Sequence, residues 1–334
     1  MKILVTGGAG YIGSTICSAL EDFGHTPIIL DSLVQGQEKF THNKVFYKGD
    51  IADEVLLKKI FKEHPDIFAT IHCAALILVP ESVSNPYDYY KENVSKSIQL
   101  FKILSSLNSS RIVFSSSASI YDVSPSFMVT ELSSIKPSSP YARTKFMMEM
   151  ILEDYCAAYN IKGIALRYFN PIGADPQMRS GAYMQNPSHV LGKLLQVAHG
   201  KEPVFNITGT GWPTRDGSGI RDFIHVWDLA LAHVKAIENF NNAFDVHHKD
   251  SNYLCLNLGT GNGVTVKELV AAFEKVFGKE IPKIETNSRP GDVAGAYANA
   301  KKAFDILGWK AEKNIEQAIS DALIWRTHPN HCGS

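Results

Sequence analysis

The sequence predicts an α/β protein built on a doubly wound parallel sheet with helices on both faces. Apolar runs of strand length alternate with helical patterns over residues 1–171, and this order is typical of parallel sheets. The first run, KILVTG, is continuously apolar, as expected for a strand that is buried on both faces. A glycine-rich turn, GGAGYIG, then separates this strand from the first helical pattern.

The elements expected in this region follow in order. STICSALEDFG has helical spacing and a glycine stop, and TPIIL forms a second strand that ends at Asp31. The pattern continues as strand KVFYKGD, helix DEVLLKKIFKEH, strand IFATIHCAA, helix YKENVSKSIQLFKILSSL, strand RIVFSSSA, helix SPYARTKFMMEMIL and strand IKGIALRYFNP. We therefore expect a nucleotide-binding sheet of the Rossmann type.

The composition changes after Pro171. Residues 172–222 are rich in Gly, Pro, Asn and Ser and contain one helical stretch, HVLGKLLQVAHG. Further patterns are strand-helix RDFIHVWDLALAHVKAIENF, strand YLCLNLGTG, helix TVKELVAAFEKVFG with a capping box at Thr265 and Glu268, a strand near 281–286, and a last helix in NIEQAISDALIWRTH. We expect residues 1–171 to form the nucleotide-binding domain, with 223–250 returning to it. Residues 172–222 and 251–334 would form a smaller α+β substrate-binding domain.

Composition excludes several classes of function. The 334 residues carry a formal net charge of −1, so the basic excess typical of nucleic-acid binding is absent. No segment reaches the roughly 18 apolar residues of a membrane span, and the N-terminal apolar run is too short for a signal peptide. The five cysteines are scattered without zinc-type spacing, so we expect free thiols, no metal site and a cytoplasmic protein.

The glycine turn predicts a dinucleotide site. GGAGYIG fits G-x-G-x-x-G at Gly8, Gly10 and Gly13, and fits a second glycine pattern at Gly7, Gly10 and Gly13. Glycines between a buried strand and a helix let backbone N–H groups approach a pyrophosphate. Asp31 ends the second strand, where a carboxylate would accept hydrogen bonds from an adenosine ribose and favour NAD over NADP.

A second constellation predicts acid–base chemistry. Ser115 to Ser117 end a predicted strand at the edge where α/β sheets bind ligands. Tyr141 and Lys145 share one face of the next helix. The ordinary tyrosine pKa is roughly 10, and a neighbouring ammonium and an oxidised nicotinamide would both favour the phenolate. The rest of this helix, FMMEMIL, is interpreted as packing and dimer surface.

Together these features resemble the extended short-chain dehydrogenase/reductase family, and within it the UDP-hexose 4-epimerases. The resemblance covers essentially the whole chain and includes VTGGAGYIGS, ESVSNPYDYYKENV, FSSSASIYD, LRYFNPIGADP, DGSGIRDFIHVWDLALAHV, NLGTGNGVTV and RPGDVAGAYAN. It implies reversible C4 epimerisation of a UDP-hexose in galactose metabolism. Hydride would pass from C4 to bound NAD, leaving a 4-keto sugar, and would return to the opposite face.

The resemblance also implies roles for individual residues. Tyr141 would be the catalytic acid/base, Lys145 would lower its pKa and hold the nicotinamide ribose, and Ser117 would orient the sugar hydroxyl. The positions that match NAD contacts are Gly7, Gly10, Tyr11, Ile12, Gly13, Asp31, Ser32, Leu33, Asp50, Ile51, Cys73, Ala74, Ala75, Asn93, Ser115, Tyr141, Lys145, Tyr168 and Phe169. The positions that match UDP-sugar contacts are Ser117, Asn170, His189, Val190, Arg221, Arg289, Asp292 and Ala296. Helices around Tyr89 to Leu107 and Tyr141 to Tyr159 would form a four-helix homodimer interface.

The chain departs from the family pattern in places that bear on substrate. Ile77 stands where a Lys is frequent, and the loop after Pro171 reads DPQMRSGAYMQNPSHV without the usual GEDP string. Ser188-His189-Val190 replaces the Asn-Asn-Leu that holds uracil in many relatives. Ala296 stands where some relatives have Tyr, which leaves room for an N-acetyl group and suggests UDP-GlcNAc/UDP-GalNAc as a second substrate pair.

Other activities fit parts of the pattern. A nucleotide-sugar dehydratase would need carboxylates at the strand end, where this chain has Ser115 to Ser117. A 4-epimerase of UDP-glucuronate or a UDP-pentose would use the same Tyr141 and Lys145, with Arg179 as a conceivable partner for a substrate carboxylate. A non-catalytic NAD-sensing binder would be expected to lack the Tyr or the Lys.

Overall fold

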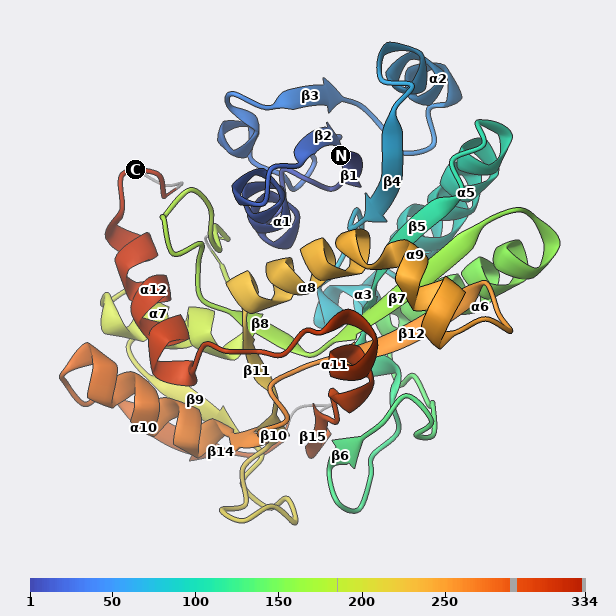
Figure 1. Cartoon of the computed structure of the whole chain (residues 1–334). Helices are drawn as coiled ribbons and strands as arrows, with labels where there is room; N and C mark the ends of the chain where they lie inside the picture. The colour runs from blue at the N-terminus through green and yellow to red at the C-terminus, as the bar shows by residue number, and fades with distance from the viewer. Residues whose placement is uncertain (185, 289–292, 332–334) are drawn as a thin grey trace.

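The computed structural model describes residues 1–184, 186–288 and 293–331. Its centre is a seven-stranded sheet in the order β12-β7-β5-β4-β1-β2-β3 (Figure 1). Every neighbouring pair in this sheet runs parallel. The strands are β1 (Lys2–Thr6), β2 (Thr26–Asp31), β3 (Val45–Lys48), β4 (Ile67–His72), β5 (Arg111–Ser117), β7 (Lys162–Tyr168) and β12 (Tyr253–Leu258). The predicted doubly wound sheet is therefore confirmed.

The strand order reverses beside β1. The chain builds β2 and β3 on one side of β1 and then returns to place β4 on the other side. In open α/β sheets, ligands bind outside the carboxyl ends of the strands at such a reversal. This topology directs attention to the loops that follow β1, β4 and β5.

Helices cover both faces of the sheet because its strands are apolar on both sides. Ile3 and Val5 of β1 join the cluster that packs under α1 (Tyr11–Asp22) and α8 (Val226–Glu238). Leu4 points to the opposite face, whose cluster contains residues of α2 (Glu54–Glu63), α5 (Lys96–Ser106) and α6 (Pro140–Ala158). This alternation follows from the two-residue period of a strand.

The structure corrects the expected domain boundary at residue 251. Strand β12 pairs with β7 in the large sheet, and Leu254, Leu256 and Leu258 are buried in the same cluster as α8. The helix α11 (Lys301–Leu307), which the sequence pattern did not predict, contributes Leu307 to that cluster. The apolar side chains of both elements thus belong to the core of the nucleotide-binding unit.

A smaller group of elements lies at one side of the large sheet (Figure 1). Its apolar cluster is formed around α7 (Val190–Ala198), α10 (Val266–Phe277), α12 (Ile315–Thr327) and the parallel pair β9 (Phe205–Thr208) and β14 (Lys283–Thr286). The predicted capping box at Thr265 and Glu268 is confirmed at the start of α10. The short strands are β6 (Met128–Val129), β8 (Asn170–Ile172), β10 (Ile220–Arg221), β11 (Phe223–His225), β13 (Val264–Thr265) and β15 (Gly295–Ala298).

The helix expected around residues 89–107 is interrupted. The chain forms α3 (Val79–Ser84) and α4 (Pro86–Tyr90), then a π-helical turn at Lys91–Ser95 before α5 begins. Within that turn the amide of Asn93 accepts a hydrogen bond from Leu76 N at 2.8 Å and donates to Leu76 O at 2.9 Å. Such bulges often mark functional positions. The remaining short helical segments are Glu38–Thr41, Ala118–Ile120, Phe240–Asn242 and Ala243–His247.

A buried ion pair attaches α6 to the sheet. Glu149 of α6 is 2% exposed and Arg167 of β7 is 4% exposed. Arg167 Nε donates to both carboxylate oxygens of Glu149 at 3.0 Å, and Nη2 donates to Oε2 at 2.6 Å. Ser116 of β5 and Tyr253 of β12 also donate hydrogen bonds to this carboxylate. Glu149 thereby connects α6 to three strands.

Two further structural observations concern the described residues. None of the helices in the ranges given above is long and apolar enough to cross a bilayer. Across the same part of the chain, no group of three or more His, Cys, Asp or Glu side chains is arranged to hold a metal ion. Cys17, Cys73, Cys156 and Cys255 are free thiols.

Replacing Glu149 with Gln should lower the free energy of unfolding by about 3–5 kcal/mol, because Arg167 would remain buried without its counter-charge. Urea denaturation followed by circular dichroism measures this. As a control, Lys58→Ala removes a pair with Glu54 in which both side chains are more than half exposed, and it should cost less than about 1 kcal/mol. A Glu149→Gln loss as small as the control loss would contradict a structural role for the buried pair.

Candidate functional site

The glycine turn between β1 and α1 is shaped to receive a phosphate group. Gly7 has φ +72°, and a Cβ added there would lie 2.7 Å from Ala74 N. A Cβ on Gly13 would clash with the carbonyl oxygen of Gly7. At Gly10, by contrast, the atom nearest to an added Cβ would be 3.3 Å away. Gly10 is also the N-cap of α1 and makes no side-chain hydrogen bond to the helix. The first N–H groups of α1 are thus open to an anionic ligand, which fits the pyrophosphate of NAD.

Asp31 stands at the carboxyl end of β2, as predicted. Its carboxylate accepts hydrogen bonds from the glycine turn and from the loop that follows β2. Oδ2 accepts from Ala9 N in the glycine turn at 3.0 Å, and Oδ1 accepts from Leu33 N at 2.8 Å. Burial raises the pKa of Asp31, while the two backbone hydrogen bonds oppose that rise. Each carboxylate oxygen keeps acceptor capacity for a ribose hydroxyl. Leu33 adopts a left-handed backbone with φ 61°, and Ser32 beside it is exposed.

Several other predicted cofactor positions serve to fix the surrounding loops. The hydroxyl of Tyr11 donates to Gly173 O at 2.7 Å. Asp50 accepts from Lys96 Nζ at 2.5 Å, and the adjacent Ile51 is buried. Asn93 holds Leu76, which follows Cys73, Ala74 and Ala75 along the loop after β4. Ile12 packs against the large core cluster. The loops after β1, β3 and β4 themselves leave the same edge of the sheet, because these strands are parallel.

Tyr141, Lys145, Ser115 and Ser117 meet at the carboxyl end of β5. Ser139 caps α6 and accepts from Ala142 N at 3.2 Å, so that Tyr141 lies in the first turn of the helix. Lys145 Nζ donates to Ser115 O at 2.8 Å and lies 5.9 Å from the centre of the Tyr141 ring. Ser117 is hydrogen-bonded to Tyr141. The predicted juxtaposition of the Tyr-Lys pair with the strand-end serines is therefore present.

The electrostatics of this group are set by burial. Burial raises the pKa of Tyr141, and the hydrogen bond with Ser117 opposes the rise. Burial lowers the pKa of Lys145 to about 8, while Cys73 and Glu149 act in the opposite direction. Lys145 is therefore mostly an ammonium at neutral pH. The predicted effect of Lys145 on the Tyr141 pKa stays a proposal.

Cys73 and Tyr168 also contact Ser115. Cys73 Sγ lies 3.1 Å from Ser115 Oγ, and burial raises the pKa of Cys73 to about 11. The thiol therefore stays protonated at neutral pH. Tyr168 is hydrogen-bonded to Ser115, and burial raises its pKa well above the ordinary value. Phe169 is buried in a small cluster with Ile120, and Ala296 packs against that cluster.

The predicted substrate residues of β10 and β15 lie on adjacent strands. Arg221 and Ala296 are paired in register. The Arg221 guanidinium donates through Nη1 to Ile220 O at 2.7 Å and to Ala294 O at 3.0 Å. Backbone N–H of Asn170 donates to Asp222 O at 3.0 Å, which leaves the exposed side chain of Asn170 uninvolved in that contact. Arg221, Ala296 and Asn170 therefore lie on the same side of the site as Phe169.

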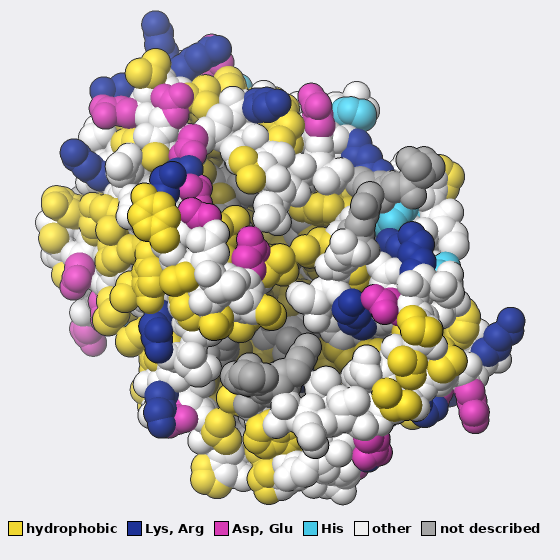
Figure 2. Space-filling model, turned by 180° about the vertical axis from the view of Figure 1, so that it is seen from behind, with side chains coloured by type: hydrophobic (Ala, Val, Ile, Leu, Met, Phe, Trp, Pro, Cys, Tyr) yellow, Lys and Arg dark blue, Asp and Glu magenta, His cyan; other side chains and the backbone are white. Residues whose placement is uncertain are grey.

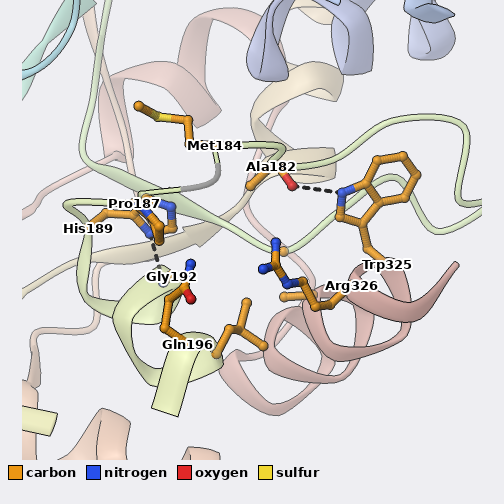
Figure 3. A pocket seen from close by; sticks show the side chains of 11 residues that line it. Ala182, Met184, Pro187, His189, Gly192, Gln196, Trp325 and Arg326 are labelled. Atoms are coloured by element: carbon orange, nitrogen blue, oxygen red, sulfur yellow. Dashed lines mark hydrogen bonds between the residues drawn. The ribbon is translucent and has the colours of Figure 1, made fainter. Parts of the chain in front are cut away.

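His189 and Val190 begin α7 in the smaller group of elements. His189 Nδ1 accepts from Gly192 N at 3.1 Å, so the ring proton is assigned to Nε2. Burial lowers the pKa of His189 to about 4, which keeps the imidazole neutral at pH 7. The residue lines a small cavity of about 30 Å³ between α7 and α12, together with Met184, Gln196 and Arg326 (Figure 3). A neutral Nε2–H could donate to a ligand carbonyl.

Two of the remaining positions fall outside the described part of the chain, and two lie within it. Arg289 and Asp292 lie outside the described residues. Ile77 is half exposed. Arg179 binds Asp22 and Asp175 through ion pairs of 2.6 Å each, so it is already engaged by two carboxylates and does not suit a substrate carboxylate.

Two residues that position the site were missed by sequence reasoning. Glu149 belongs to FMMEMIL, which was interpreted as packing and dimer surface, yet it binds Ser116 and Arg167. Asp222 is fully buried and accepts hydrogen bonds from Thr260 N, Gly261 N and Ala298 N at 2.8–3.1 Å. A charged residue inside an otherwise apolar helical face was the available signal for Glu149; Asp222 is simply part of the RDFIHV block.

The chain is similar to known proteins over nearly its full length. Residues 3–248 match the model of the NAD dependent epimerase/dehydratase family. The UDP-glucose 4-epimerase of Bacillus subtilis (strain 168) is 40% identical over 98% of this chain and 97% of its own length.

Solved structures agree with this similarity. A UDP-glucose 4-epimerase from Stenotrophomonas maltophila, with bound NAD and formylated UDP-arabinopyranose, has a TM-score of 0.91 at 37% identity and covers 98% of each chain. A UDP-glucose 4-epimerase from Bifidobacterium longum, in complex with NAD+ and UDP, has a TM-score of 0.89 at 35% identity and covers 99% of each chain. The likeness therefore extends through both the large sheet and the smaller group of elements.

Proposed function

Because the chain belongs to the NAD dependent epimerase/dehydratase family, we propose that it interconverts UDP-glucose and UDP-galactose by inverting the configuration at C4. The observation that carries the proposal is the contact of Tyr141 with Ser117, one helical turn from Lys145. This group lies at the same sheet edge as the glycine turn of a dinucleotide site. The 40% identity with a curated UDP-glucose 4-epimerase supports this choice within the family.

NAD is the cofactor of this family, and the residues present fit it. The pyrophosphate would be held by the glycine turn and the start of α1, which has no side-chain cap. The adenosine ribose would be held by Asp31. Lys145, next to the Ser115 carbonyl, would hold the nicotinamide ribose. The chemistry that the cofactor supplies when bound is hydride exchange with C4, which passes through a 4-keto sugar.

Tyr141 moves the proton. Its phenolic oxygen would accept the proton of the sugar 4-hydroxyl and return it in the second half of the cycle. Ser117 favours the phenolate by its hydrogen bond to Tyr141. Lys145 contributes a positive charge 5.9 Å from the Tyr141 ring, and this charge is lost as the pH rises above about 8. Burial of all three groups excludes the water that would otherwise compete for these hydrogen bonds.

The UDP end would be fixed while the sugar keeps freedom to turn. Arg221 suits the diphosphate because its planar guanidinium donates two parallel hydrogen bonds. His189, neutral with a proton on Nε2, would donate to the uracil, with Val190 beside it. Asn170 would contact the substrate from the Phe169 side, and Arg289 and Asp292 are proposed for the diphosphate and ribose. Anchoring at one end lets both faces of C4 be presented to the same cofactor.

The position of Ala296 supports a second pair of substrates, UDP-GlcNAc and UDP-GalNAc. Ala296 packs against the cluster of Phe169 and Ile120, and it is paired with Arg221. A methyl side chain at this position, in register with Arg221, would leave more room than the Tyr of some relatives. A sugar with a 2-N-acetyl group would use that volume.

A UDP-pentose 4-epimerase is the remaining alternative. A UDP-arabinopyranose derivative is bound in the Stenotrophomonas maltophila relative, and a pentose would use the same Tyr141 and Lys145. A dehydratase is disfavoured, because Glu149, the carboxylate that accepts a hydrogen bond from Ser116, is already bound to Arg167. UDP-glucuronate is disfavoured as well, because Arg179 is bound to Asp22 and Asp175.

Tyr141→Phe should lower kcat by about 10²–10⁴-fold, because the proton of the 4-hydroxyl loses its acceptor. The measurement is chromatographic conversion of UDP-galactose at saturating NAD. Tyr155→Phe on the same helix is the matched control, since Tyr155 makes ring contacts with Phe101 and Tyr159, and it should keep its activity. Undiminished turnover in Tyr141→Phe would refute the assignment of the acid/base.

Ala296→Tyr should lower kcat/KM for UDP-GlcNAc at least about 10-fold more than for UDP-glucose, as expected when a pocket loses the volume for one substituent. Both substrates are assayed in parallel, with Ala296→Ser as a control that keeps a small side chain and should preserve both activities. If the ratio of the two activities is unchanged in Ala296→Tyr, the volume argument is wrong.

We also propose that the protein is a homodimer. Val83 and Tyr87 are 64% and 71% exposed on α3 and α4, and Met150 and Tyr159 are exposed at α6. Viewed from behind, the side of the molecule that carries α5 and α6 has hydrophobic side chains gathered on it (Figure 2). Such a patch on a folded chain is typical of an interface.

Light scattering at micromolar concentration should therefore give the mass of two chains, and Tyr87→Glu should shift it toward that of one, because a carboxylate would be buried at the interface. Leu132→Glu places the same charge at a 97% exposed position outside these helices and should leave the mass unchanged. A wild-type protein that is monomeric under these conditions would contradict the proposal.

A further inference from the structure

The segment Asp175–Tyr183 lies in the loop that departs from the family pattern, and it is held against α1. Ser180 Oγ lies 3.0 Å from Thr15 Oγ1 of that helix. Arg179 donates to the Asp22 carboxylate at 2.6 and 2.9 Å, at the last residue of the helix. The segment thus follows α1 along its length, and α1 begins at the glycine turn.

The same segment is rigid within itself. Asp175 is completely buried, accepts from Arg179 Nε at 2.6 Å, and donates its backbone N–H to Ser180 O at 2.9 Å. Met178 has a left-handed backbone with φ 55°, a conformation that costs about 1 kcal/mol for a non-glycine residue. Its carbonyl oxygen accepts from Asn330 Nδ2 at 3.0 Å. A strained backbone persists only where surrounding contacts hold it.

Tyr183, the last residue of the segment, reaches both parts of the dinucleotide site. Its hydroxyl donates to Gln35 O at 2.7 Å, and Gln35 belongs to the loop that follows Asp31. The hydroxyl also lies 4.0 Å from the position of a Cβ on Gly10. The loop folds back on the glycine turn, where Gln37 N donates to Ala9 O at 2.9 Å. Tyr183 therefore lies between the expected positions of the pyrophosphate and the adenosine ribose.

The smaller group of elements supports the segment from the other side. Trp325 of α12 donates through Nε1 to Ala182 O at 2.8 Å, the contact drawn in Figure 3. A Cβ on Gly181 would lie 2.7 Å from the indole ring, so the backbone approaches the ring closely because glycine stands there. The Phe40 ring packs against both Tyr183 and Trp325, with ring centroids 5.6 and 6.1 Å apart.

We propose that residues 175–183 act as a clamp that retains NAD, with Tyr183 as its closing contact. The inference rests on the proposed use of NAD by this site. For the cofactor to leave, the loop after Asp31 must move away from the glycine turn. That movement requires the Tyr183–Gln35 hydrogen bond and the contact between the Tyr183 and Phe40 rings to break. These contacts thus slow release without touching Tyr141, Lys145 or Ser117.

The test is the rate of NAD release from the loaded protein, followed after rapid desalting by enzymatic assay of free NAD. Tyr183→Phe should release NAD about 3- to 10-fold faster, the effect of losing one hydrogen bond. Tyr183→Ala, which also loses the ring contact with Phe40, should release it more than about 10-fold faster. Trp325→Phe, which loses the indole donor to Ala182 and part of the ring contact with Phe40, should accelerate release as well. Tyr159→Phe is the control, at a half-exposed tyrosine at the end of α6, and should release NAD at the wild-type rate.

The melting temperature of the cofactor-free variants separates retention from folding. Tyr183→Phe should melt within a few degrees of the wild type while releasing NAD faster. Release at the wild-type rate by Tyr183→Phe, Tyr183→Ala and Trp325→Phe would overturn the clamp and leave the epimerase proposal standing. A wild-type protein that binds no NAD would overturn the clamp together with the proposed use of the cofactor.

Discussion

The site depends on how the helix α6 is attached to the strand β5. Glu149 accepts a hydrogen bond from Ser116, which stands between the two serines that contact Lys145 and Tyr141. The same carboxylate is paired with Arg167 on β7 and accepts from Tyr253 on β12. A buried charge tolerates little displacement, because lost hydrogen bonds are not replaced by water. This network therefore fixes the position of α6 relative to the carboxyl end of β5. It thereby also fixes the contacts of Tyr141 with Ser117 and of Lys145 with Ser115.

The residues proposed for nucleotide binding and those proposed for proton transfer are positioned by different physical means. Nucleotide binding relies on the absence of side chains, since Gly7 and Gly13 allow backbone atoms to come closer than any Cβ would permit. The proposed proton transfer relies on buried side chains whose pKa values are moved by desolvation: that of Tyr141 upward and that of Lys145 downward to about 8. The two groups of residues meet at the carboxyl edge of one parallel sheet, because the loops after the neighbouring strands β1, β4 and β5 leave that edge side by side. The proposed substrate contacts come from β10, β15 and α7, outside that sheet, and so could vary without altering the proposed chemistry.

Local patterns in the sequence were sufficient for much of this arrangement. The buried parallel strands, the glycine turn, Asp31 at the end of β2 and the capping box at Thr265 each depend on residues close together in the chain, and the structure has them where they were expected. What could not be predicted depends on distant partners. Strand β12 joins the large sheet because it pairs with β7, about 90 positions earlier in the chain, and because its leucines fit the core under that sheet. Glu149, in a Met-rich stretch, is understood only beside Arg167. The role of Tyr183 requires Gln35, 148 positions away.

We propose that C4 of the sugar loses and regains the same hydrogen while Tyr141 handles only the hydroxyl proton. UDP-galactose carrying deuterium at C4, incubated with the protein and NAD in ordinary water, tests this directly by mass spectrometry and NMR of the product. We expect UDP-glucose with the deuterium retained at C4, because hydride is exchanged only inside the site. UDP-glucose in which hydrogen from the solvent has replaced the deuterium at C4 would contradict it.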